Sequence, residues 1–383
     1  MTNGVARYFV FLFQIEAETN KNKQIIIMIG ILTFQATNNF GAHLHVIALY
    51  RKIHELGYDC EVMDYQSPNL IARETSSFRN LGWNPKRRLS YLLWGRKVEQ
   101  KYKILLKELR TYVKMSPVYN QKNIKEANKR YNTFVIGADV VWSLRITDHD
   151  YNFFLDFADD EKLKLAYSSS VGETNLYRDD KRLPTLLNRF DQIAVREQEA
   201  VEWVKNIAGK EANYVCDPTM LLTSQDWDQV LSPKKYEEDY VLVYFFVKEK
   251  MYQQILDYSK EHHLKVKLIN SGRDVAGMET VWPKSLSEFV GLIKHAQALF
   301  TASYHGMLFG LYYHRELFFY NRGLKARMTS LSAKFGLENH NGDLILDINN
   351  VPKIDYQKVD EKIKIFRDYS INELKQMLAN NGK

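Results

Sequence analysis

The segment from Ala298 to Asn321 constrains the fold of this chain more than any other, because it combines a strand, a turn, a helix and a second strand. Four mostly apolar residues, Ala298 to Thr301, are typical of a buried strand, and apolar residues then recur at the spacing of one helix face. A second apolar run, Leu317 to Tyr320, follows one helix length later. The segment therefore indicates an α/β sheet with a tight turn at the carboxyl end of a strand.

His305 lies in that tight turn, with Ser303 just before it. In an open α/β sheet, ligands bind at the carboxyl ends of the strands. The free N–H groups at the start of a helix attract anions. We therefore take His305 and Ser303 as candidate functional residues. A histidine that only caps the helix is the alternative. The neighbours of His305 in this turn are small or polar, and a purely structural loop would not need to exclude larger side chains.

Length and composition limit the class of protein. A chain of 383 residues exceeds one ordinary core, so two domains are expected. The two cysteines, Cys60 and Cys216, cannot form a disulfide framework and show no zinc-binding spacing, which favours a reducing, cytoplasmic compartment. The net charge of +7 indicates anionic small ligands or an anionic surface rather than nucleic acid.

The chain begins with an apolar segment that does not read as a membrane span. Residues 1–27 contain a run too short to cross a bilayer, and no run of eighteen apolar residues follows elsewhere. We interpret residues 1–27 as an N-terminal extension, because the first strand begins near Met28, which is itself a candidate for the natural start. The protein is expected to be soluble, and docking on a membrane surface stays open.

The first domain is expected to span residues 28–225. A continuous β-branched run ends near Phe34, as in a strand buried on both faces, and a turn with Asn38, Asn39 and Gly41 leads into a helix. Such a first turn is where a doubly wound domain holds a ligand. The turn lacks the GxGxxG pattern of a dinucleotide site, and simple turn chemistry would also explain its asparagines.

Residues 67–129 form an insertion rich in lysine and arginine, interleaved with Trp83 and Trp94. A basic amphipathic helix of this kind can lie on the anionic inner face of a plasma membrane or grip a phosphate-bearing acceptor. A solvated helix face is the alternative interpretation.

Further candidates follow later strands of the first domain. Asp139 could accept a proton or bind a sugar hydroxyl, and Trp142 could stack on a sugar ring. Ser169 lies in a serine-rich turn after the next strand, and Arg196 begins a helix after the strand beyond. Arginine offers a planar fork of donors that matches carboxylate or phosphate. The alternatives are a turn aspartate, a core tryptophan and a structural Arg–Glu pair.

A second alternating α/β unit follows a polar stretch that we interpret as a linker. It is expected to span residues 238–355, with Arg322 and Arg327 in a basic stretch near its end, and residues 356–383 are expected to form a helix that packs back. Two alternating halves of similar size predict two Rossmann-like domains that face one another across a cleft.

Five stretches resemble those of the polysaccharide pyruvyl transferase family. They are GILTFQATNNFGAHLHVIAL, FVIGADVVWS, AVREQEAVEWV followed by YVCDPTMLL, the TASYHG turn, and the RxxxAR stretch before KFGL. Their order and spacing match over nearly all of the chain from Met28 onward. The resemblance implies a glycosyltransferase B-like architecture. It also implies transfer of the enolpyruvyl part of phosphoenolpyruvate to two hydroxyls of a hexose, which gives a cyclic pyruvate ketal and phosphate.

The implied reaction assigns expected roles to the candidates. Phosphoenolpyruvate is a co-substrate with two anionic groups, so its site needs fixed positive charge, which Arg196, Arg327 and Arg322 could supply. His305 would act as acid or phosphate partner and Asp139 as base or hydroxyl-binding group. No further cofactor and no metal are expected. The implied acceptor is a hexose-containing, lipid-linked oligosaccharide on the way to an exopolysaccharide, capsule or cell wall polysaccharide.

The chain also departs from the family pattern. Family members commonly have Asp at the position of Ala302, SDQ where this chain has Ala138, Asp139 and Val140, and Gln at the position of His45. These changes leave the acceptor open. Two alternatives therefore stand beside the pyruvyl transferase: a glycosyltransferase of the same architecture that uses a nucleotide sugar, with Glu316 as its candidate ribose ligand, and a non-catalytic sugar-binding protein of an assembly complex.

Overall fold

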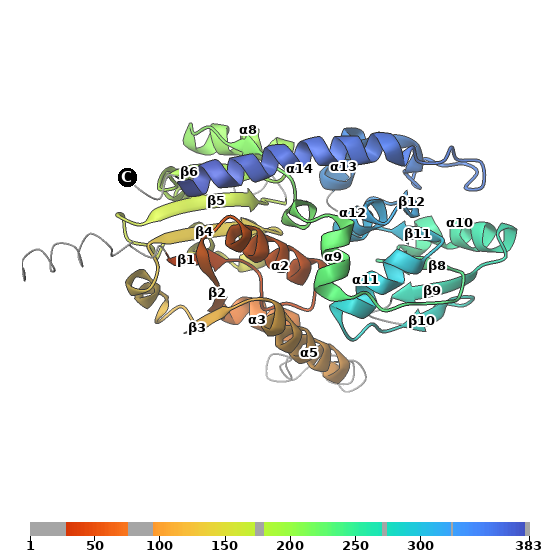
Figure 1. The fold of residues 1–383 in the computed structure, drawn as a ribbon, viewed down its shortest axis with the longest axis horizontal. Coiled ribbons are helices and arrows are strands. Elements are labelled where there is room, and N and C mark those ends of the chain that lie inside the picture. The colour runs from red at the N-terminus through yellow and green to blue at the C-terminus, as the bar shows by residue number, and fades with distance from the viewer. Residues whose placement is uncertain (1–27, 76–94, 173–179, 270–273, 323–324, 380–383) are drawn as a thin grey trace, which may run out of the picture.

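The computed structural model describes residues 28–75, 95–172, 180–269, 274–322 and 325–379. Within these residues the chain forms two parallel sheets flanked by helices, one sheet in each half of the molecule (Figure 1). The predicted extension, residues 1–27, lies outside the described residues, as does the part of the basic insertion that carries Trp83 and Trp94.

The first sheet has seven strands in the order β3-β2-β1-β4-β5-β6-β7, and all of its pairs are parallel. Its strands are β1 (Met28–Leu32), β2 (Asp59–Tyr65), β3 (Met115–Tyr119), β4 (Thr133–Ala138), β5 (Leu163–Ser169), β6 (Gln192–Val195) and β7 (Asn213–Tyr214). The connecting helices are α2 (Phe40–Glu55), α3 (Pro68–Thr75), α5 (Arg96–Tyr112), α6 (Leu144–Thr147), α7 (Leu183–Asn188) and α8 (Gln198–Ala208), with short 3-10 turns η3 (Ile124–Lys129), η4 (Tyr151–Phe154) and η5 (Pro218–Leu221).

The second sheet has five strands in the order β10-β9-β8-β11-β12, again all parallel. Its strands are β8 (Tyr240–Tyr244), β9 (Lys265–Ile269), β10 (Glu279–Val281), β11 (Ala298–Thr301) and β12 (Glu316–Phe319). The helices of this half are α10 (Lys248–Glu261), α11 (Leu286–His295), α12 (Tyr304–Tyr312) and α13 (Lys325–Phe335), with the turn η6 (Glu338–His340). Helix α9 (Ser224–Leu231) lies between the two halves (Figure 1).

Both sheets reverse their strand order once, which marks the place where a ligand crevice opens in such folds. In the first sheet the reversal lies between β1 and β4, and in the second between β8 and β11. The loops after β1 and β4 carry Asn38, Asn39 and Asp139. The loop after β11 carries Ser303, and His305 follows in the first turn of α12. The two reversal points therefore bring the sequence-predicted candidates of both domains toward one another.

The halves are joined by apolar packing as well as by the chain. Phe40, at the start of α2, stacks on Phe289 of α11 with ring centroids 4.5 Å apart. Side chains of α2, α11 and α12 belong to one continuous buried cluster. The last helix, α14 (Tyr356–Ala379), runs from the second half back across the first, as expected (Figure 1).

Two elements differ from the sequence interpretation. The predicted insertion contains β3, an edge strand of the first sheet. Its Pro117 is tolerated there because no ladder donor is needed at an edge. The predicted linker contains α9, whose N-cap Thr223 and third residue Asp226 form a reciprocal capping box. Trp227 of α9 is fully buried, so this segment is packed structure rather than a loose connection.

Candidate functional site

His305 sits in the first turn of α12, at the carboxyl end of β11. Ser303 caps the helix, and its Oγ accepts a hydrogen bond from the backbone N–H of Gly306 at 3.1 Å. A Cβ at Gly306 would lie 2.5 Å from Thr301 Oγ1, so glycine allows the tight turn from strand to helix. The fold thus fixes the imidazole at the interface between the two domains.

The imidazole packs directly on the first domain. A Cβ at Gly41, in the first turn of α2, would collide with the ring of His305. His305 Nε2 lies 3.5 Å from Oδ2 of Asp217, which follows the last strand of the first sheet. This Nε2 is buried and makes no hydrogen bond among the described residues.

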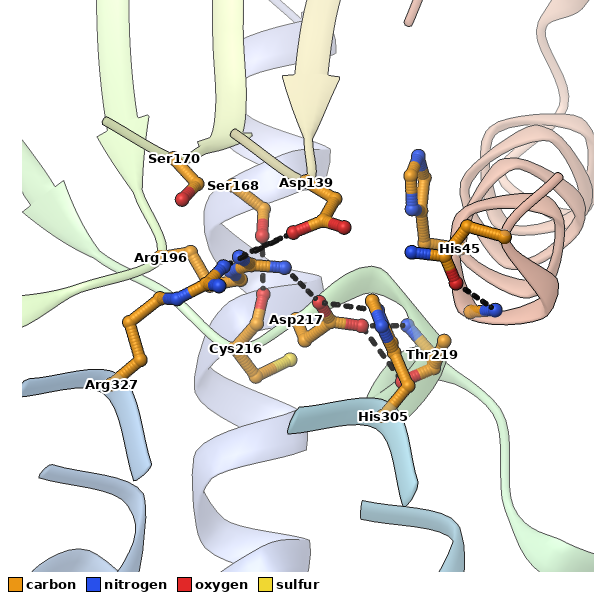
Figure 2. A network of polar contacts seen from close by, with 12 residues as sticks. His45, Asp139, Ser168, Ser170, Arg196, Cys216, Asp217, Thr219, His305 and Arg327 are labelled. Atoms are coloured by element: carbon orange, nitrogen blue, oxygen red, sulfur yellow. Dashed lines mark hydrogen bonds and ion pairs between the residues drawn. The ribbon is translucent and has the colours of Figure 1, made fainter. Parts of the chain in front are cut away.

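Asp217 links the histidine to a chain of alternating charges, which we call the buried network: His305, Asp217, Arg196, Asp139 and Arg327 (Figure 2). Arg196 donates to Asp217 Oδ2 at 2.7 Å and to Asp139 Oδ1 at 3.0 Å. Arg327, from α13 of the second domain, donates to the same Asp139 oxygen at 3.2 Å. The buried network therefore joins the two domains at two points.

The charges of the buried network largely neutralise one another. The side chain of Arg196 is 0% exposed, and Glu197 Oε1 lies 3.4 Å from its guanidinium as a third carboxylate. Burial raises the pKa of Asp139, but Arg196, His305 and Arg327 outweigh it and leave that pKa well below its ordinary value. Burial likewise opposes ionisation of Asp217, yet His305 and Arg196 hold its pKa well below normal. Both carboxylates are thus ionised and poor proton acceptors at neutral pH.

His45 of α2 lies beside the buried network. Its ring is fully buried, 6.2 Å from the ring of His305, and Nε2 hydrogen-bonds with Thr33 Oγ1 at 2.9 Å. Burial lowers the pKa of His45 to about 3, against the opposing effect of Asp217. His45 is therefore a neutral imidazole, and its Nδ1 has no hydrogen-bond partner among the described residues.

The backbone beside Asp139 is strained. Val140 has φ of 48°, in the left-handed region that β-branched residues rarely adopt. Strain of this kind persists only where surrounding contacts impose it, and it clusters at functional sites. The strained residue directly follows Asp139, whose side chain lies between two arginines.

A cavity of about 840 Å³ opens between the two domains next to this cluster. Asn38, Asn39 and Arg322 line it, so three of the predicted binding residues face the same space. His305 is not among the lining residues, but its neighbours are: Asn39 caps α2 just before Gly41, and Tyr244 lies against Gly306. The buried network is separated from the cavity by about one layer of residues.

Two predicted binding residues do not face a ligand. Trp142 is 1% exposed, stacks on Phe154 and donates from Nε1 to the carbonyl of Phe153 at 3.1 Å. A tryptophan in this core cannot stack on a sugar ring. Ser169 is fully buried and donates to the carbonyl of Ile136 at 3.2 Å within the sheet. Both expectations are corrected, because apolar packing and strand pairing occupy these side chains.

Sequence reasoning missed two members of the site. Asp217 was not singled out, although its place after the last strand of the first sheet is itself a signal for a ligand edge. Tyr304 places its ring 4.6 Å from the Arg196 guanidinium and shields it from solvent. No sequence signal points to Tyr304, because its partner lies more than a hundred residues earlier.

The two facing Rossmann-like domains, with a crevice at both reversal points, place the protein in the glycosyltransferase B-like class of α/β proteins, as predicted. The sequence profile of one family, polysaccharide pyruvyl transferase, matches residues 39–323, which is most of the chain. The chain belongs to the polysaccharide pyruvyl transferase family, and the predicted family is confirmed. Comparison with curated protein sequences gives no match.

Solved structures with a similar fold include two UDP-GlcNAc 2-epimerases and a glycosyltransferase. The epimerase from Methanocaldococcus jannaschii is 11% identical with a TM-score of 0.48, over 92% of this chain and 99% of that one. The epimerase from Neisseria meningitidis is 8% identical with a TM-score of 0.46, over 92% and 98%. The glycosyltransferase from Streptomyces nogalater is 9% identical with a TM-score of 0.42, over 93% and 100%. These values support no statement about substrate, so the fold class rests on the strand order.

The described residues contain neither a metal-binding cluster nor a membrane-spanning helix. Across residues 28–379 with their gaps, no group of three histidine, cysteine, aspartate or glutamate side chains is arranged to hold a metal ion. None of the helices described there is both long enough and apolar enough to cross a membrane.

Proposed function

We propose that this protein transfers the pyruvyl group of phosphoenolpyruvate to two hydroxyls of a hexose in a cell-surface polysaccharide precursor, forming a pyruvate ketal and releasing phosphate. Membership of the polysaccharide pyruvyl transferase family supports the class of reaction. The observation that carries the finer proposal is His305 Nε2, a buried and unpartnered nitrogen held 3.5 Å from Asp217 at the domain interface.

The chemistry requires proton transfers that this pair can perform. A proton delivered to the methylene carbon of phosphoenolpyruvate makes the neighbouring carbon electrophilic, and the first sugar hydroxyl attacks it and loses its proton. Cleavage of the carbon–oxygen bond to phosphate then lets the second hydroxyl close the ketal and lose its proton. One released proton balances the one added to carbon, and the other leaves on the phosphate. His305 would carry these protons, with Asp217 orienting its ring.

Asp139 and Arg196 take other roles in this proposal than the sequence suggested. Asp139 is held ionised between two arginines, so it would orient groups rather than remove protons. Arg196 is enclosed by three carboxylates, so it would hold the buried network in place rather than bind the donor alone. His305 becomes accessible when the domains separate, because it contacts Gly41 and Asp217 of the opposite domain.

The acceptor and location follow from the same proposal. We infer a cytoplasmic protein that meets a lipid-linked oligosaccharide at the inner face of the membrane, with phosphoenolpyruvate as co-substrate and no further cofactor. Leu105 and Leu109 of α5 pack inward, while Lys103 and Lys107 are exposed. This helix would therefore contact an anionic surface through charge alone. Salt-sensitive flotation with anionic but not neutral liposomes would support the contact.

The nucleotide-sugar alternative loses its candidate residue. Glu316, proposed as a ribose ligand, is the first residue of β12 and lies 3.7 Å from His340. It therefore occupies the amino end of its strand, whereas ligands of this fold bind at the carboxyl ends.

The test is direct. The protein is incubated with phosphoenolpyruvate and a panel of lipid-linked and nitrophenyl-linked hexosides, and mass spectrometry detects addition of a pyruvyl unit while a colorimetric assay detects phosphate. Stoichiometric product and phosphate are expected with at least one hexoside. Transfer of a sugar from UDP-glucose or UDP-GlcNAc in a parallel reaction, with no pyruvyl product, would replace the proposal by the glycosyltransferase alternative.

A further inference from the structure

The cavity between the domains is lined by three cations that the proposed chemistry does not use together: Lys101, Lys248 and Arg322. Lys101 comes from α5 of the first domain, Lys248 begins α10, and Arg322 follows β12 in the second domain. The three charges thus reach one space from both sides of the crevice.

None of these three side chains forms an ion pair with a carboxylate of the described residues. Lys101 Nζ lies 4.0 Å from the centroid of the Phe40 ring, and the guanidinium of Arg322 lies 4.7 Å from that of Phe245. Aromatic faces attract cations but do not neutralise them. Burial lowers the pKa of Lys101 to about 8, with Glu74 opposing the shift. An anion that binds beside Lys101 would therefore stabilise its buried ammonium group.

The acidic lining residues cancel this excess only in part, because two carboxylates, Glu74 and Asp274, face three cations. Glu74 accepts hydrogen bonds from Thr37 Oγ1 at 2.8 Å and from the backbone N–H of Asn38 at 2.9 Å, so it is engaged in holding the first turn. Asp274, the other acidic lining residue, accepts from Thr280 Oγ1 at 2.7 Å. The contrast with the buried network is clear, because there every arginine already has a carboxylate partner.

The remaining walls suit a carbon-bearing ligand larger than the donor. Four aromatic side chains line the cavity: Tyr244, Phe245, Phe246 and Tyr252. The volume of about 840 Å³ lies in the upper part of the range of roughly 300–1,000 Å³ typical of pockets for ligands of drug size. A three-carbon acid would fill a small part of it. Aromatic faces beside cations are well suited to a sugar ring that carries phosphate.

We propose that this cavity is a phosphate-ester subsite in which Lys101, Lys248 and Arg322 bind the phosphate of a glycosyl phosphate from both domains at once. The choice of a saccharide as the esterified group rests on the proposed function, whereas the binding of a phosphate group rests only on the three cations. Phosphoenolpyruvate shares the same chemistry, and the experiment separates the two sources. An anion held by residues of both domains would also draw the domains together over His305.

Isothermal titration calorimetry on the full chain tests this subsite. Glucose 1-phosphate and phosphoenolpyruvate are the probes, and methyl glucoside is the uncharged control. Lys101→Met and Arg322→Met are each expected to weaken binding of glucose 1-phosphate about tenfold, as for loss of a charge-assisted contact. Lys260→Met, an exposed lysine in the last turn of α10, which Lys248 begins, is the matched control and should bind as the unmodified protein does. Circular dichroism melting confirms that each variant is folded.

The outcomes separate the ligands and the two proposals. Loss confined to glucose 1-phosphate assigns the subsite to the acceptor, and loss confined to phosphoenolpyruvate assigns it to the donor and refutes the saccharide. Equal binding of both esters by all three variants, or no binding of either ester to the unmodified protein at millimolar concentration, overturns the subsite. Lys101-dependent binding without any pyruvyl product in the hexoside assay would remove the proposed reaction and leave the subsite standing.

Discussion

The buried network and the inter-domain cavity lie within about one residue layer of each other and handle charge in opposite ways. In the buried network, Arg196 is fully enclosed and meets three carboxylates. In the cavity, Arg322 is exposed and meets an aromatic ring. Two arginines that look alike in the sequence as anion binders therefore differ in what they can do: one holds protein carboxylates, and the other has its charge available for a ligand.

This difference suggests a division of labour. A pre-formed cluster of paired charges can hold an imidazole rigidly, which is what proton transfer needs. Cations that share a cavity without an anion repel one another, so an anionic ligand that binds between them lowers this repulsion. The following predictions test this division, from the largest expected effect to the smallest.

Replacing His305 by alanine should have the largest effect on activity. Loss of a general acid or base typically lowers the rate by about 10²–10⁴-fold. Phosphate release from phosphoenolpyruvate in the presence of acceptor measures the loss. His314→Ala, an exposed histidine just beyond the same helix, is the control and should retain full activity. Normal turnover of His305→Ala would show that the imidazole only packs.

Replacing Arg196 by methionine should have the largest effect on stability. Removing a fully buried cation leaves Asp217 without its guanidinium partner and Asp139 with Arg327 alone, which costs about 3–5 kcal/mol of unfolding free energy. Urea unfolding followed by circular dichroism measures it. Arg196→Lys keeps the charge but not the planar fork, so it should lose less. A methionine variant as stable as the unmodified protein would mean that the buried network does not hold the domains.

Acid should destabilise the protein before the carboxylates titrate. Burial lowers the pKa of His45 to about 3 and that of His43 to about 4, while both titrate near 6.5 when unfolded. The unfolded state therefore binds more protons below pH 6.5, and stability falls as pH drops from there toward 4. Asp217 contributes in the same direction only below about pH 4, because its pKa is lowered from an ordinary value near 3.9.

The variant His45→Gln isolates this effect. It should remove one proton from the pH dependence, about 1.4 kcal/mol per pH unit between pH 6 and pH 4. Unfolding free energies measured at several pH values provide the slope. An unchanged slope would mean that His45 is solvated or protonated in the folded protein.

Replacing Arg322 by methionine should leave stability almost untouched. An exposed side chain without a carboxylate partner contributes within about 0.5 kcal/mol. The same urea experiment that shows a large loss for Arg196→Met should therefore show none here, while the calorimetric affinity for glucose 1-phosphate falls. A loss of stability similar to that of Arg196→Met would erase the distinction between the two regions.

Much of the fold could be predicted from the sequence, because the pattern of parallel strands is local. The segment from Ala298 to Asn321 folds as strand, turn, helix and strand, and the run after Gln24 leads into β1 and α2. The edge strand β3 was not predicted, because the basic residues around it and its own Pro117 weaken the apolar pattern that is typical of a strand. Helix α9 was not predicted, because its polar composition was interpreted as a linker and the capping residue Thr223 was not recognised.

The site was predictable in its members more than in their roles. His305, Arg196, Asp139 and Arg327 were each found from a strand end or from the family resemblance, and the structure brings them together. Their partnerships were not predictable, because Arg196 and Asp139 are 57 residues apart and only the fold makes them neighbours. Trp142 was misjudged for the same reason: whether a tryptophan after a strand faces a crevice or a core depends on distant side chains.

Helix α14 has a consequence for how the chain is made. Its Ser370 hydrogen-bonds with the N–H of Cys216 and receives the hydroxyl of Tyr167 at its carbonyl, and both contacts lie deep in the first domain. The N-terminal half thus needs residues that are synthesised after the second domain. Its core can be completed only after synthesis has passed the second domain, so the two halves are expected to finish folding together rather than one after the other.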